Sequence, residues 1–321
     1  MMKIEIAAAA ALIATTASAA PVAASGDGHL TFTSAHSNMV MISVGGGKPV
    51  PATFDTGSIG LQIYDFAVGK DVTPAKDSPG TRAYGGGRVF HVKYAMAKVA
   101  IEGISTVKPI EIAIVTEKSC TDGKCPDLTG AALEAAAKKS GRIGIIGVGF
   151  GSEAHTPNPI RELPAQYSDG YVVSNEGITL GLASASGFKT VSQPAGTVAG
   201  TYGKLFNACL TIAKTTLKKG CSPTLFDTGN GSVTVAPSQL AQLPTTPHTA
   251  EAVVPGAVDW KFTAGGPHQI RFHSHAPAVL GLPFLTGYDV EIDLAGGKYG
   301  FQKRAQAVPF SAMRNQETDG S

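Results

Sequence analysis

The stretch TFDTGSIGLQIY, residues 53–64, places the carboxylate of Asp55 between a β-type apolar run and a tight turn. The stretch LFDTGNGSVTVA, residues 225–236, repeats this arrangement with Asp227. Asp and Gly are common turn residues, so one Asp-Thr-Gly alone indicates little. Two copies, each entered through a Phe at the end of an apolar run, indicate a duplicated unit. The sequence therefore predicts two related halves, each with one acidic turn.

Each acidic turn is followed later in the chain by two apolar residues and a glycine. The run IIG at 145–147 follows the first turn, and VLG at 279–281 follows the second. The interval is shorter in the second half, as expected for a duplicated unit with one trimmed copy. The apolar-apolar-Gly run that follows both turns strengthens the prediction of an internal repeat.

The composition favours a β protein with a large core. The chain has 321 residues, of which 43% are hydrophobic and 16% charged, enough for one large domain or two lobes. Its 39 Gly and 20 Pro, with many Val, Ile and Thr, are typical of short strands joined by turns. Residues 128–141 form the clearest helical segment, with Gly141 as its stop. The net charge of +2, without a basic run, argues against nucleic acid as a partner.

The first residues predict export. Residues 1–19 contain a short apolar run and end in Ala-Ser-Ala, a motif typical of signal-peptide cleavage. The run is too short to span a membrane as a helix, and no cysteine that could carry a lipid anchor lies near the motif. We therefore expect a signal peptide at 1–19, a disordered N-terminus at 20–28 and a polar tail at 304–321. The mature chain is expected to be periplasmic or secreted, without a membrane anchor.

Four cysteines are spaced as two close pairs. Cys120 and Cys125 are near neighbours in the chain, as are Cys209 and Cys221. An even number of cysteines in an exported chain indicates disulfides. Three connectivities are open, and proximity in the sequence favours Cys120–Cys125 and Cys209–Cys221. Zinc is the rival interpretation, but neither spacing has neighbouring histidines.

The two acidic turns, and the apolar-apolar-Gly runs that follow them in the chain, resemble those of the pepsin-like, bilobal aspartic proteases. The resemblance spans about residues 29–303. It implies an all-β fold with two β-barrel-like lobes, a central cleft and little helix. We expect an N-terminal lobe over residues 29–175 and a C-terminal lobe over residues 176–303, each with one acidic turn.

The resemblance identifies Asp55 and Asp227 as a catalytic pair. Hydrolysis of a peptide bond needs a base to activate water and an acid to protonate the carbonyl or the amine. Two carboxyl groups about 3 Å apart cannot both ionise, so they share one proton and their pKa values separate. Such a pair titrates as a unit, so the sequence leaves the separate roles of the two residues open.

The residues after each Asp have supporting roles in the same family. The predicted supporting residues are Thr56, Gly57 and Ser58 in the first turn and Thr228, Gly229 and Asn230 in the second. By the resemblance, the threonines bond across to the other loop, and the glycines let backbone N–H groups approach the carboxylates. Ser58 offers its hydroxyl to the first Asp. Asn230 stands where the family usually has Ser or Thr, and an amide can still donate a hydrogen bond.

Residues 81–94, TRAYGGGRVFHVKY, resemble the flap of this family, a hairpin that closes over the substrate. Tyr84 and Gly85 match its Tyr-Gly pair, and Tyr84 is expected to cover the site and help exclude water. The segment also suits an ordinary β-hairpin. Two positions depart from the family: Gln62 replaces the Trp that usually supports the flap Tyr, and Leu282 replaces an Asp.

These features predict an aspartic endopeptidase that cleaves polypeptides in an extended conformation. The resemblance implies a water activated by the Asp pair, no metal, no cofactor, inhibition by pepstatin-like compounds and a monomeric enzyme. Too few residues separate the cleavage motif from Asp55 for a typical inhibitory propeptide, so no zymogen is expected.

The sequence leaves other interpretations open. The main alternative is a catalytically inactive pepsin-fold binding module of the cell envelope, because one fold can host several functions. His268, His273 and His275 could together ligate a metal. The stretch GVGFGS at 147–152 could pass for a dinucleotide loop, but no helix is expected after it. Pepstatin binding separates the active enzyme from the inactive module.

Overall fold

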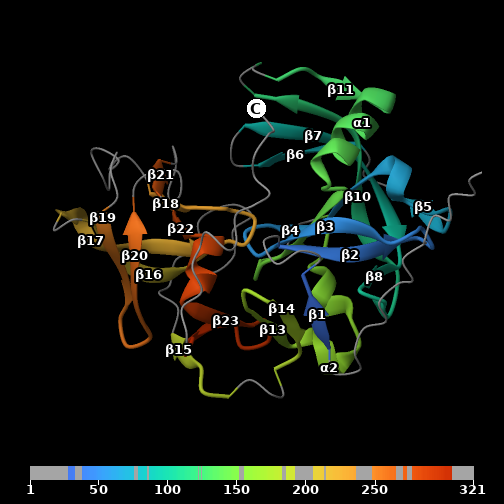
Figure 1. Cartoon of the computed structure of the whole chain (residues 1–321). Helices are drawn as coiled ribbons and strands as arrows, with labels where there is room; N and C mark the ends of the chain where they lie inside the picture. Colours follow the sequence, from blue (N-terminus) through green and yellow to red (C-terminus); the bar gives the residue numbers. More distant parts are fainter. Residues whose placement is uncertain are drawn as a thin grey trace, which may run out of the picture.

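The computed structural model of the chain describes residues 28–32, 38–75, 79–84, 87–121, 123, 125–151, 155–182, 186–191, 205–212, 215–235, 248–264, 270–272 and 277–305. These residues form a molecule of three β-sheets with little helix (Figure 1). The all-β, bilobal architecture expected from the sequence is confirmed. Across these ranges no helix is long and apolar enough to cross a membrane.

The first half of the chain forms one large sheet. Within the described ranges it follows the path β5-β7-β10-β4-β12-β3-β2-β8-β9, with β6 paired to β7 and β11 to β10. Its strands are β2 (Met39–Val44), β3 (Val50–Asp55), β4 (Ile59–Tyr64), β5 (Val72–Pro74), β6 (Gly80–Tyr84), β7 (Arg88–Ala97), β8 (Val99–Ile101), β9 (Ile104–Ser105), β10 (Ile110–Cys120), β11 (Leu128–Thr129) and β12 (Gly144–Val148).

The second half forms a smaller sheet in the order β20-β19-β16-β17-β22-β18-β21. Its described strands are β16 (Phe206–Ile212), β17 (Thr215–Phe226), β18 (Val233–Val235), β19 (His248–Val254), β20 (Val258–Ala264), β21 (Ile270–Phe272) and β22 (Ala278–Leu280). The two large sheets lie on opposite sides of the molecule in Figure 1.

Both acidic turns occupy the same strand arrangement. β3 ends at Asp55 and pairs parallel with β12, where Asp55 is opposite Gly147, and β12 pairs antiparallel with β4. In the second half β17 pairs parallel with β22, where Phe226 is opposite Leu280, and β22 pairs antiparallel with β18. The apolar-apolar-Gly runs therefore lie beside the two acidic turns, as the internal repeat predicts.

A third sheet joins the two halves. Its order is β1-β14-β13-β23-β24-β15, so strands from the start, middle and end of the described chain pair side by side. They are β1 (His29–Thr31), β13 (Gly170–Val173), β14 (Gly177–Leu180), β15 (Lys189–Val191), β23 (Tyr288–Asp293) and β24 (Lys298–Lys303). The division expected between residues 175 and 176 falls in the turn between β13 and β14, inside this shared sheet.

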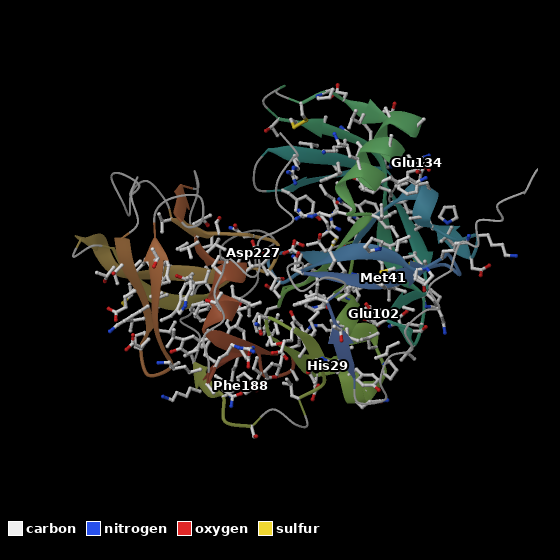
Figure 2. The ribbon with its side chains drawn as sticks, in the orientation of Figure 1. His29, Met41, Glu102, Glu134, Phe188 and Asp227 are labelled. Carbon is white, nitrogen blue, oxygen red and sulfur yellow. A yellow bond between two sulfur atoms is a disulfide. The ribbon has the colours of Figure 1, made fainter. Side chains whose placement is uncertain are left out.

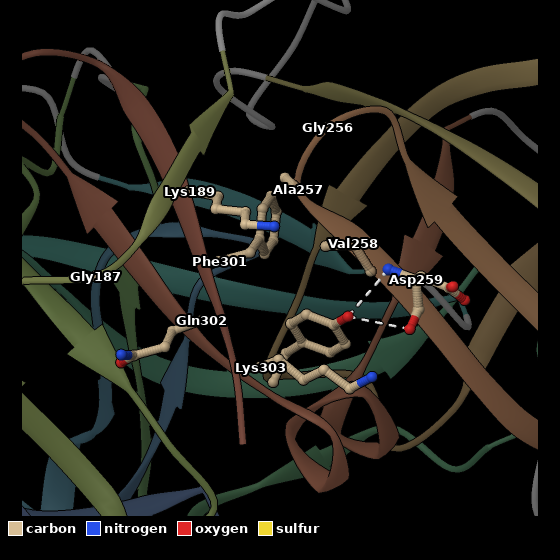
Figure 3. Close-up of a pocket in the computed structure, with 10 residues that line it drawn as sticks. Gly187, Lys189, Gly256, Ala257, Val258, Asp259, Phe301, Gln302 and Lys303 are labelled. Carbon is tan, nitrogen blue, oxygen red and sulfur yellow. Dashed lines mark hydrogen bonds between the residues drawn. The ribbon is translucent and has the colours of Figure 1, made fainter. Parts of the chain in front are cut away.

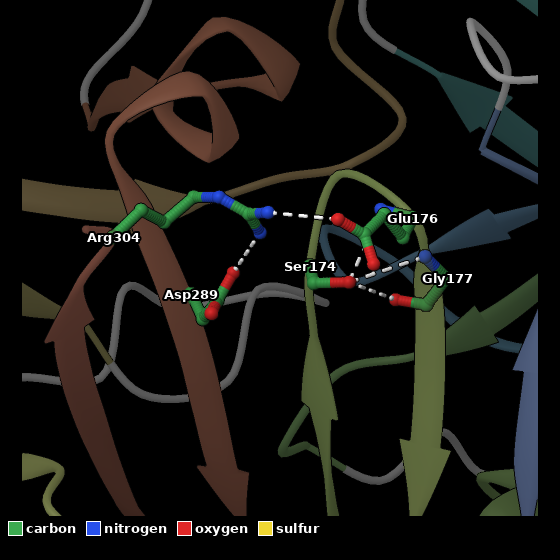
Figure 4. A network of polar contacts seen from close by, with 5 residues as sticks. All are labelled: Ser174, Glu176, Gly177, Asp289 and Arg304. Atoms are coloured by element: carbon green, nitrogen blue, oxygen red, sulfur yellow. Dashed lines mark hydrogen bonds and ion pairs between the residues drawn. The ribbon is translucent and has the colours of Figure 1, made fainter. Parts of the chain in front are cut away.

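An ion-pair network links neighbouring strands of the shared sheet (Figure 4). Arg304 donates to Asp289 of β23 at 2.6 Å and to Glu176 of the β13–β14 turn at 3.0 Å. The Ser174 hydroxyl accepts from the backbone N–H groups of Glu176 and Gly177 and so shapes that turn. The network therefore links the last described strand to a turn that lies more than a hundred residues earlier.

Buried side chains of all three sheets form one continuous core. Leu61 and Ile63 of β4 face this core together with Tyr171 of β13 and Phe301 of β24. Side chains alternate along a strand, so the opposite face of the first sheet carries a second cluster. This flap-side cluster consists of Phe90, Val92, Tyr94, Ala113, Val115 and Leu133, and Tyr84 packs against it.

The helical segment and the disulfides agree with the sequence predictions. The helix α1 (Gly130–Ser140) ends at Gly141, which is left-handed with φ 67°. The other described helices are α2 (Ala165–Ser168) and the short 3-10 turns Asp65–Ala67, Pro159–Glu162 and Leu282–Thr286. Disulfides join Cys120 to Cys125 and Cys209 to Cys221, the pairing that proximity in the sequence favoured.

A pocket lies between β15, the β19–β20 turn and the strands β23 and β24 (Figure 3). Lys189, Tyr288 and Lys303 are among the residues that line it. The Tyr288 hydroxyl accepts from the N–H of Asp259 and donates to its carbonyl, both at 3.0 Å. No residue of either acidic turn lines this pocket.

Candidate active site

Each acidic turn holds its own carboxylate with a backbone N–H group. Gly57 N–H donates to Asp55 Oδ1 at 2.8 Å, and Gly229 N–H donates to Asp227 Oδ1 at 2.7 Å. The donor lies two residues after the Asp in both turns, as the repeated Asp-Thr-Gly predicts. Bonds of this kind stabilise the ionised form of a carboxyl group.

The two carboxyl groups face each other where the halves meet. A Cβ on Gly57 would overlap the Asp227 carboxyl, and one on Gly229 would lie 2.7 Å from Asp55 Oδ1. Each glycine therefore leaves the space that the opposite carboxyl occupies. Asp55 is only 7% exposed, and Asp227 is labelled at the junction of the halves in Figure 2. A hydrogen bond joins the two carboxyl groups.

Thr56 and Thr228 cross-link the turns reciprocally. Thr56 Oγ1 donates to the Phe226 carbonyl at 2.9 Å, and Thr228 Oγ1 donates to the Phe54 carbonyl at 2.5 Å. Thr228 Oγ1 accepts from the Thr56 N–H at 3.1 Å, and Thr56 Oγ1 accepts from the Thr228 N–H at 3.0 Å. The threonines therefore set the separation and the orientation of the two turns.

The third residue after each Asp makes different side-chain hydrogen bonds in the two turns. Ser58 Oγ donates to Asp55 Oδ2 at 2.6 Å. The Asn230 side chain instead accepts from the N–H and the hydroxyl of Ser232 at 3.0 and 2.8 Å. Its amide nitrogen lies 3.5 Å from Thr234 Oγ1. The side-chain donation to Asp227 that the sequence allowed is not made in this arrangement.

The surroundings of Asp227 raise the pKa of its carboxyl well above the usual range. Burial contributes most, followed by the negative charge of Asp55 and the hydrogen bond with Asp55. The backbone N–H groups of Gly229 and Asn230 lower the pKa but do not offset these causes. Asp227 is therefore a carboxyl group that keeps its proton to unusually high pH.

Asn38, which the sequence did not single out, also joins the two turns. Its side-chain amide donates to the Thr228 carbonyl and, at 3.4 Å, to the Phe54 carbonyl. Its backbone carbonyl accepts from the Phe54 N–H at 2.7 Å. Asn38 is 4% exposed, so the amide is a buried link between the residue before Asp55 and the turn of the other half.

Replacing Asn38 with Asp is expected to destabilise the fold by about 2 kcal/mol, because a carboxylate oxygen would face two carbonyls without a proton to donate. Thermal or urea unfolding near neutral pH measures the loss. Asn207→Asp is the matched control, since Asn207 is exposed on β16. Equal midpoints for the two variants would contradict a structural role for the Asn38 amide.

A buried tyrosine supports each acidic turn. Tyr171 of β13 packs edge-on against Phe54 with ring centroids 5.3 Å apart, and its hydroxyl donates to the Val148 carbonyl at 2.8 Å. Tyr299 of β24 bonds the backbone of Phe226. Burial raises the pKa of both phenols, so both are neutral. Both come from the shared sheet, and no local sequence pattern marks them.

The predicted flap is the hairpin of β6 and β7. Tyr84 ends β6 and packs edge-on against Phe90 with ring centroids 5.7 Å apart. Its hydroxyl bonds the Ser58 side chain, and burial raises the pKa of Tyr84 to about 12. Because Ser58 donates its own proton to Asp55, the phenol is the donor in that bond. Gly85 lies outside the described residues.

Gln62 is buried in β4 on the same face as the flap-side cluster. It pairs in register with Ala113 and is 3% exposed. Among the described residues its Oε1 has no hydrogen-bond partner. Tyr84 is thus held by Ser58 rather than by a residue at position 62.

Of the other positions that the sequence singled out, Leu282 lies beside the second acidic turn, and the three histidines are not described. Leu282 begins a 3-10 turn, and its N–H donates to the Asn230 carbonyl at 2.8 Å. His268, His273 and His275 lie outside the described residues. In the part of the chain that is described, no group of three or more His, Cys, Asp and Glu could hold a metal ion.

Comparison with known proteins agrees with this geometry. A family model described as the PE-PGRS C-terminal aspartyl peptidase-like domain matches residues 28–257. The matched range contains both acidic turns and the β6–β7 hairpin, and it ends before β23 and β24. A comparison with curated proteins finds no match.

Proposed function

Since the chain belongs to the family of PE-PGRS C-terminal aspartyl peptidase-like domains, we propose that it is an aspartic endopeptidase with Asp55 and Asp227 as its catalytic pair. One observation carries the proposal: the carboxyl groups of two equivalent turns face each other where the halves meet, and burial and mutual charge raise the pKa of one of them. Reciprocal threonine bonds hold this arrangement. A binding surface has no evident need for two carboxyl groups that repel each other when both are ionised.

The proposed reaction uses one water molecule. Asp55, supported by Gly57 and Ser58, takes a proton from the water as its oxygen attacks the peptide carbonyl. Asp227 gives its proton to the carbonyl oxygen, which forms a gem-diol. The proton on Asp55 then passes to the amide nitrogen as the C–N bond breaks, and Asp227 recovers a proton from the diol. The pair returns to its starting state.

The substrate of this proposal is a polypeptide in an extended conformation. Tyr84 stands beside Ser58 and Asp55, where it would cover the bound chain and help exclude water. We further propose a pepsin-like, monomeric enzyme that pepstatin-like compounds inhibit. Export through the segment 1–19 is part of the proposal, and the two disulfides suit an oxidising compartment.

Activity is expected to fall as the pH rises through the pKa of Asp227. The carboxyl must carry a proton to act as an acid, and its raised pKa should keep activity above the usual carboxyl range near about pH 4. The stability that Asp227 contributes has the same sign: it is fully present below about pH 4 and is lost as the pH rises through the raised pKa. A profile of kcat/KM from about pH 3 to about pH 8 measures the alkaline limb.

Asn230→Ser should move this alkaline limb to lower pH by about one unit. A hydroxyl placed like that of Ser58 would donate to ionised Asp227 and so lower its pKa. Thermal unfolding of the variant controls for the lost bonds to Ser232. An alkaline limb at the same pH in both proteins would contradict the control of this limb by Asp227.

The proposed function is tested by incubating the purified chain with an unfolded protein substrate at mildly acid pH, with and without pepstatin. Cleavage that pepstatin blocks supports an aspartic peptidase. A folded protein with both disulfides formed that neither cleaves the substrate nor binds pepstatin would reject it.

The second candidate is a catalytically inactive pepsin-fold binding module. Two observations favour it: the Asn230 side chain bonds Ser232 instead of Asp227, and Gln62 takes the place of the flap-supporting Trp. Folded protein that fails the test above would leave this module as the better interpretation.

A further inference from the structure

Arg82 and Tyr84 share one face of β6. Along this strand Arg82 is buried and Tyr84 half-buried, whereas Thr81 and Ala83 are exposed. The alternation follows from the strand geometry, since residues two apart point to the same side. The flap strand therefore turns one cation and one phenol inward, toward the loop that follows Asp55.

The Arg82 guanidinium joins three segments. Its Nη2 donates to the Ile59 carbonyl at 2.9 Å and to Thr156 Oγ1 at 3.0 Å. Ile59 follows the first acidic turn, and Thr156 lies in the segment after β12. Gly60, with φ 80°, makes room for the close approach of Thr156, because a Cβ there would overlap the threonine side chain. Arg82 is 8% exposed and Thr156 is fully buried.

The guanidinium of Arg82 is a buried charge that its surroundings must stabilise. Burying a charge is costly unless hydrogen bonds and opposite charges compensate for the lost water. The positive charge of Arg82 lowers the pKa of Tyr84, and the negative charge of Asp55 raises it. The phenol of Tyr84 therefore interacts electrostatically with both the Arg82 guanidinium and the Asp55 carboxylate.

The two inward side chains of β6 attach to consecutive residues. Tyr84 donates to Ser58 Oγ, and Arg82 donates to the Ile59 carbonyl. One attachment would leave the strand free to pivot, whereas two attachments fix its direction as well as its position. Ser58 in turn donates to Asp55 Oδ2, so the chain of contacts runs from the flap strand to the carboxylate.

We propose that Arg82 is a positioning residue of the peptidase: it holds β6 against Ser58 and Ile59, so that Tyr84 stays beside Asp55. The inference rests on the proposed function. It assigns to Arg82 the support of the flap tyrosine that position 62 does not supply here, since Gln62 makes no bond to Tyr84 among the described contacts.

The test compares Arg82→Met with the intact chain in KM, kcat and pepstatin affinity. We expect KM and the pepstatin Kd to rise by about tenfold, as for the loss of one strong hydrogen bond that positions a binding element. Arg82→Lys keeps the charge and should recover part of the loss. A variant that was only less well folded would lower the apparent kcat without changing KM.

Two further variants make the comparison sharp. Thr81→Ala changes the exposed face of the same strand and is the reference variant: KM and the pepstatin Kd of Arg82→Met should lie well above its values. Thr156→Val keeps the guanidinium and removes one of its acceptors, so it should shift both values in the same direction by a smaller factor. Thr156→Val also tests the proposal if Arg82→Met does not fold. Values for Arg82→Met or Thr156→Val equal to those of Thr81→Ala would overturn the proposal.

Hydrogen exchange separates this inference from the proposed function. If the intact chain neither cleaves peptides nor binds pepstatin, the peptidase proposal fails, and exchange of the β6 amides then tests the attachment alone. Faster exchange of these amides in Arg82→Met than in Thr81→Ala supports the attachment. Equal exchange in the two variants overturns it.

Discussion

Replacing Asp55 or Asp227 with Asn is expected to lower kcat for peptide hydrolysis by about a thousandfold or more, because each proposed step needs one carboxyl as base and the other as acid. Asn keeps the shape of the side chain, and its amide can neither accept the proton from water nor return it. The threonine bonds between the two turns do not involve these carboxyl groups, and an Asn side-chain oxygen can still accept from the N–H of Gly57 or Gly229, so both variants should fold. Hydrolysis of a fluorogenic peptide at mildly acid pH measures the loss.

Asp65→Asn is the matched control for this experiment, since Asp65 is an exposed carboxylate in the same half of the chain. It should keep full activity. Asp227→Asn should also be at least as stable as the intact chain near neutral pH, because it removes a buried carboxyl group beside the negative charge of Asp55. Activity retained by either Asn variant would disprove the two-carboxyl mechanism.

Replacing Thr56 or Thr228 with Val is expected to lower the free energy of unfolding by about 2 to 4 kcal/mol. Val has nearly the same shape but no hydroxyl, so each substitution removes a donor to a buried carbonyl and the acceptor of a buried N–H group of the other half. An unsatisfied buried group costs about 1 to 3 kcal/mol. Activity should fall as well, because these bonds set the distance between the two carboxyl groups. Urea unfolding, followed by activity of the folded fraction, measures both effects.

Thr56→Ser and Thr228→Ser are the controls, because they retain the hydroxyl that bonds the opposite turn. They should lose much less stability than the Val variants. The double Val variant should lose less than the sum of the two single losses, since the four bonds form one network. Val and Ser variants of equal stability would show that the hydroxyl bonds do not hold the turns together.

The sequence predicted the parts of the candidate site that consist of residues adjacent to one another in the chain. The repeated Asp-Thr-Gly led to both carboxyl groups, both threonines and both turn glycines, because a tight turn of this kind depends on its own few residues. Tyr84 was found through the resemblance of residues 81–94 to the flap of the pepsin-like proteases. The helix over residues 130–140 and the two disulfides followed from local composition and spacing.

Other members of the site lie far from the turns in the chain. Asn38 is 190 residues from its partner Thr228, and Arg82 is 74 residues from Thr156. Nothing beside Asn38 or Arg82 in the sequence marks them as special, because their partners are brought to them by the pairing of distant strands. The orientation of the Asn230 side chain was likewise open until Ser232 proved to be its partner.

By itself, then, the sequence determined the class of fold, the duplicated plan and the two acidic turns, because each of these depends on short-range pattern and turn chemistry. The tertiary structure alone decided how the halves are joined, through a sheet that mixes strands from both. It also placed Asp227 where burial and the charge of Asp55 raise the pKa of its carboxyl, and it decided which side chains hold the flap. Burial, opposing charge and hydrogen-bond partners are properties of neighbours in space, and folding brings those neighbours together from segments that the sequence keeps apart.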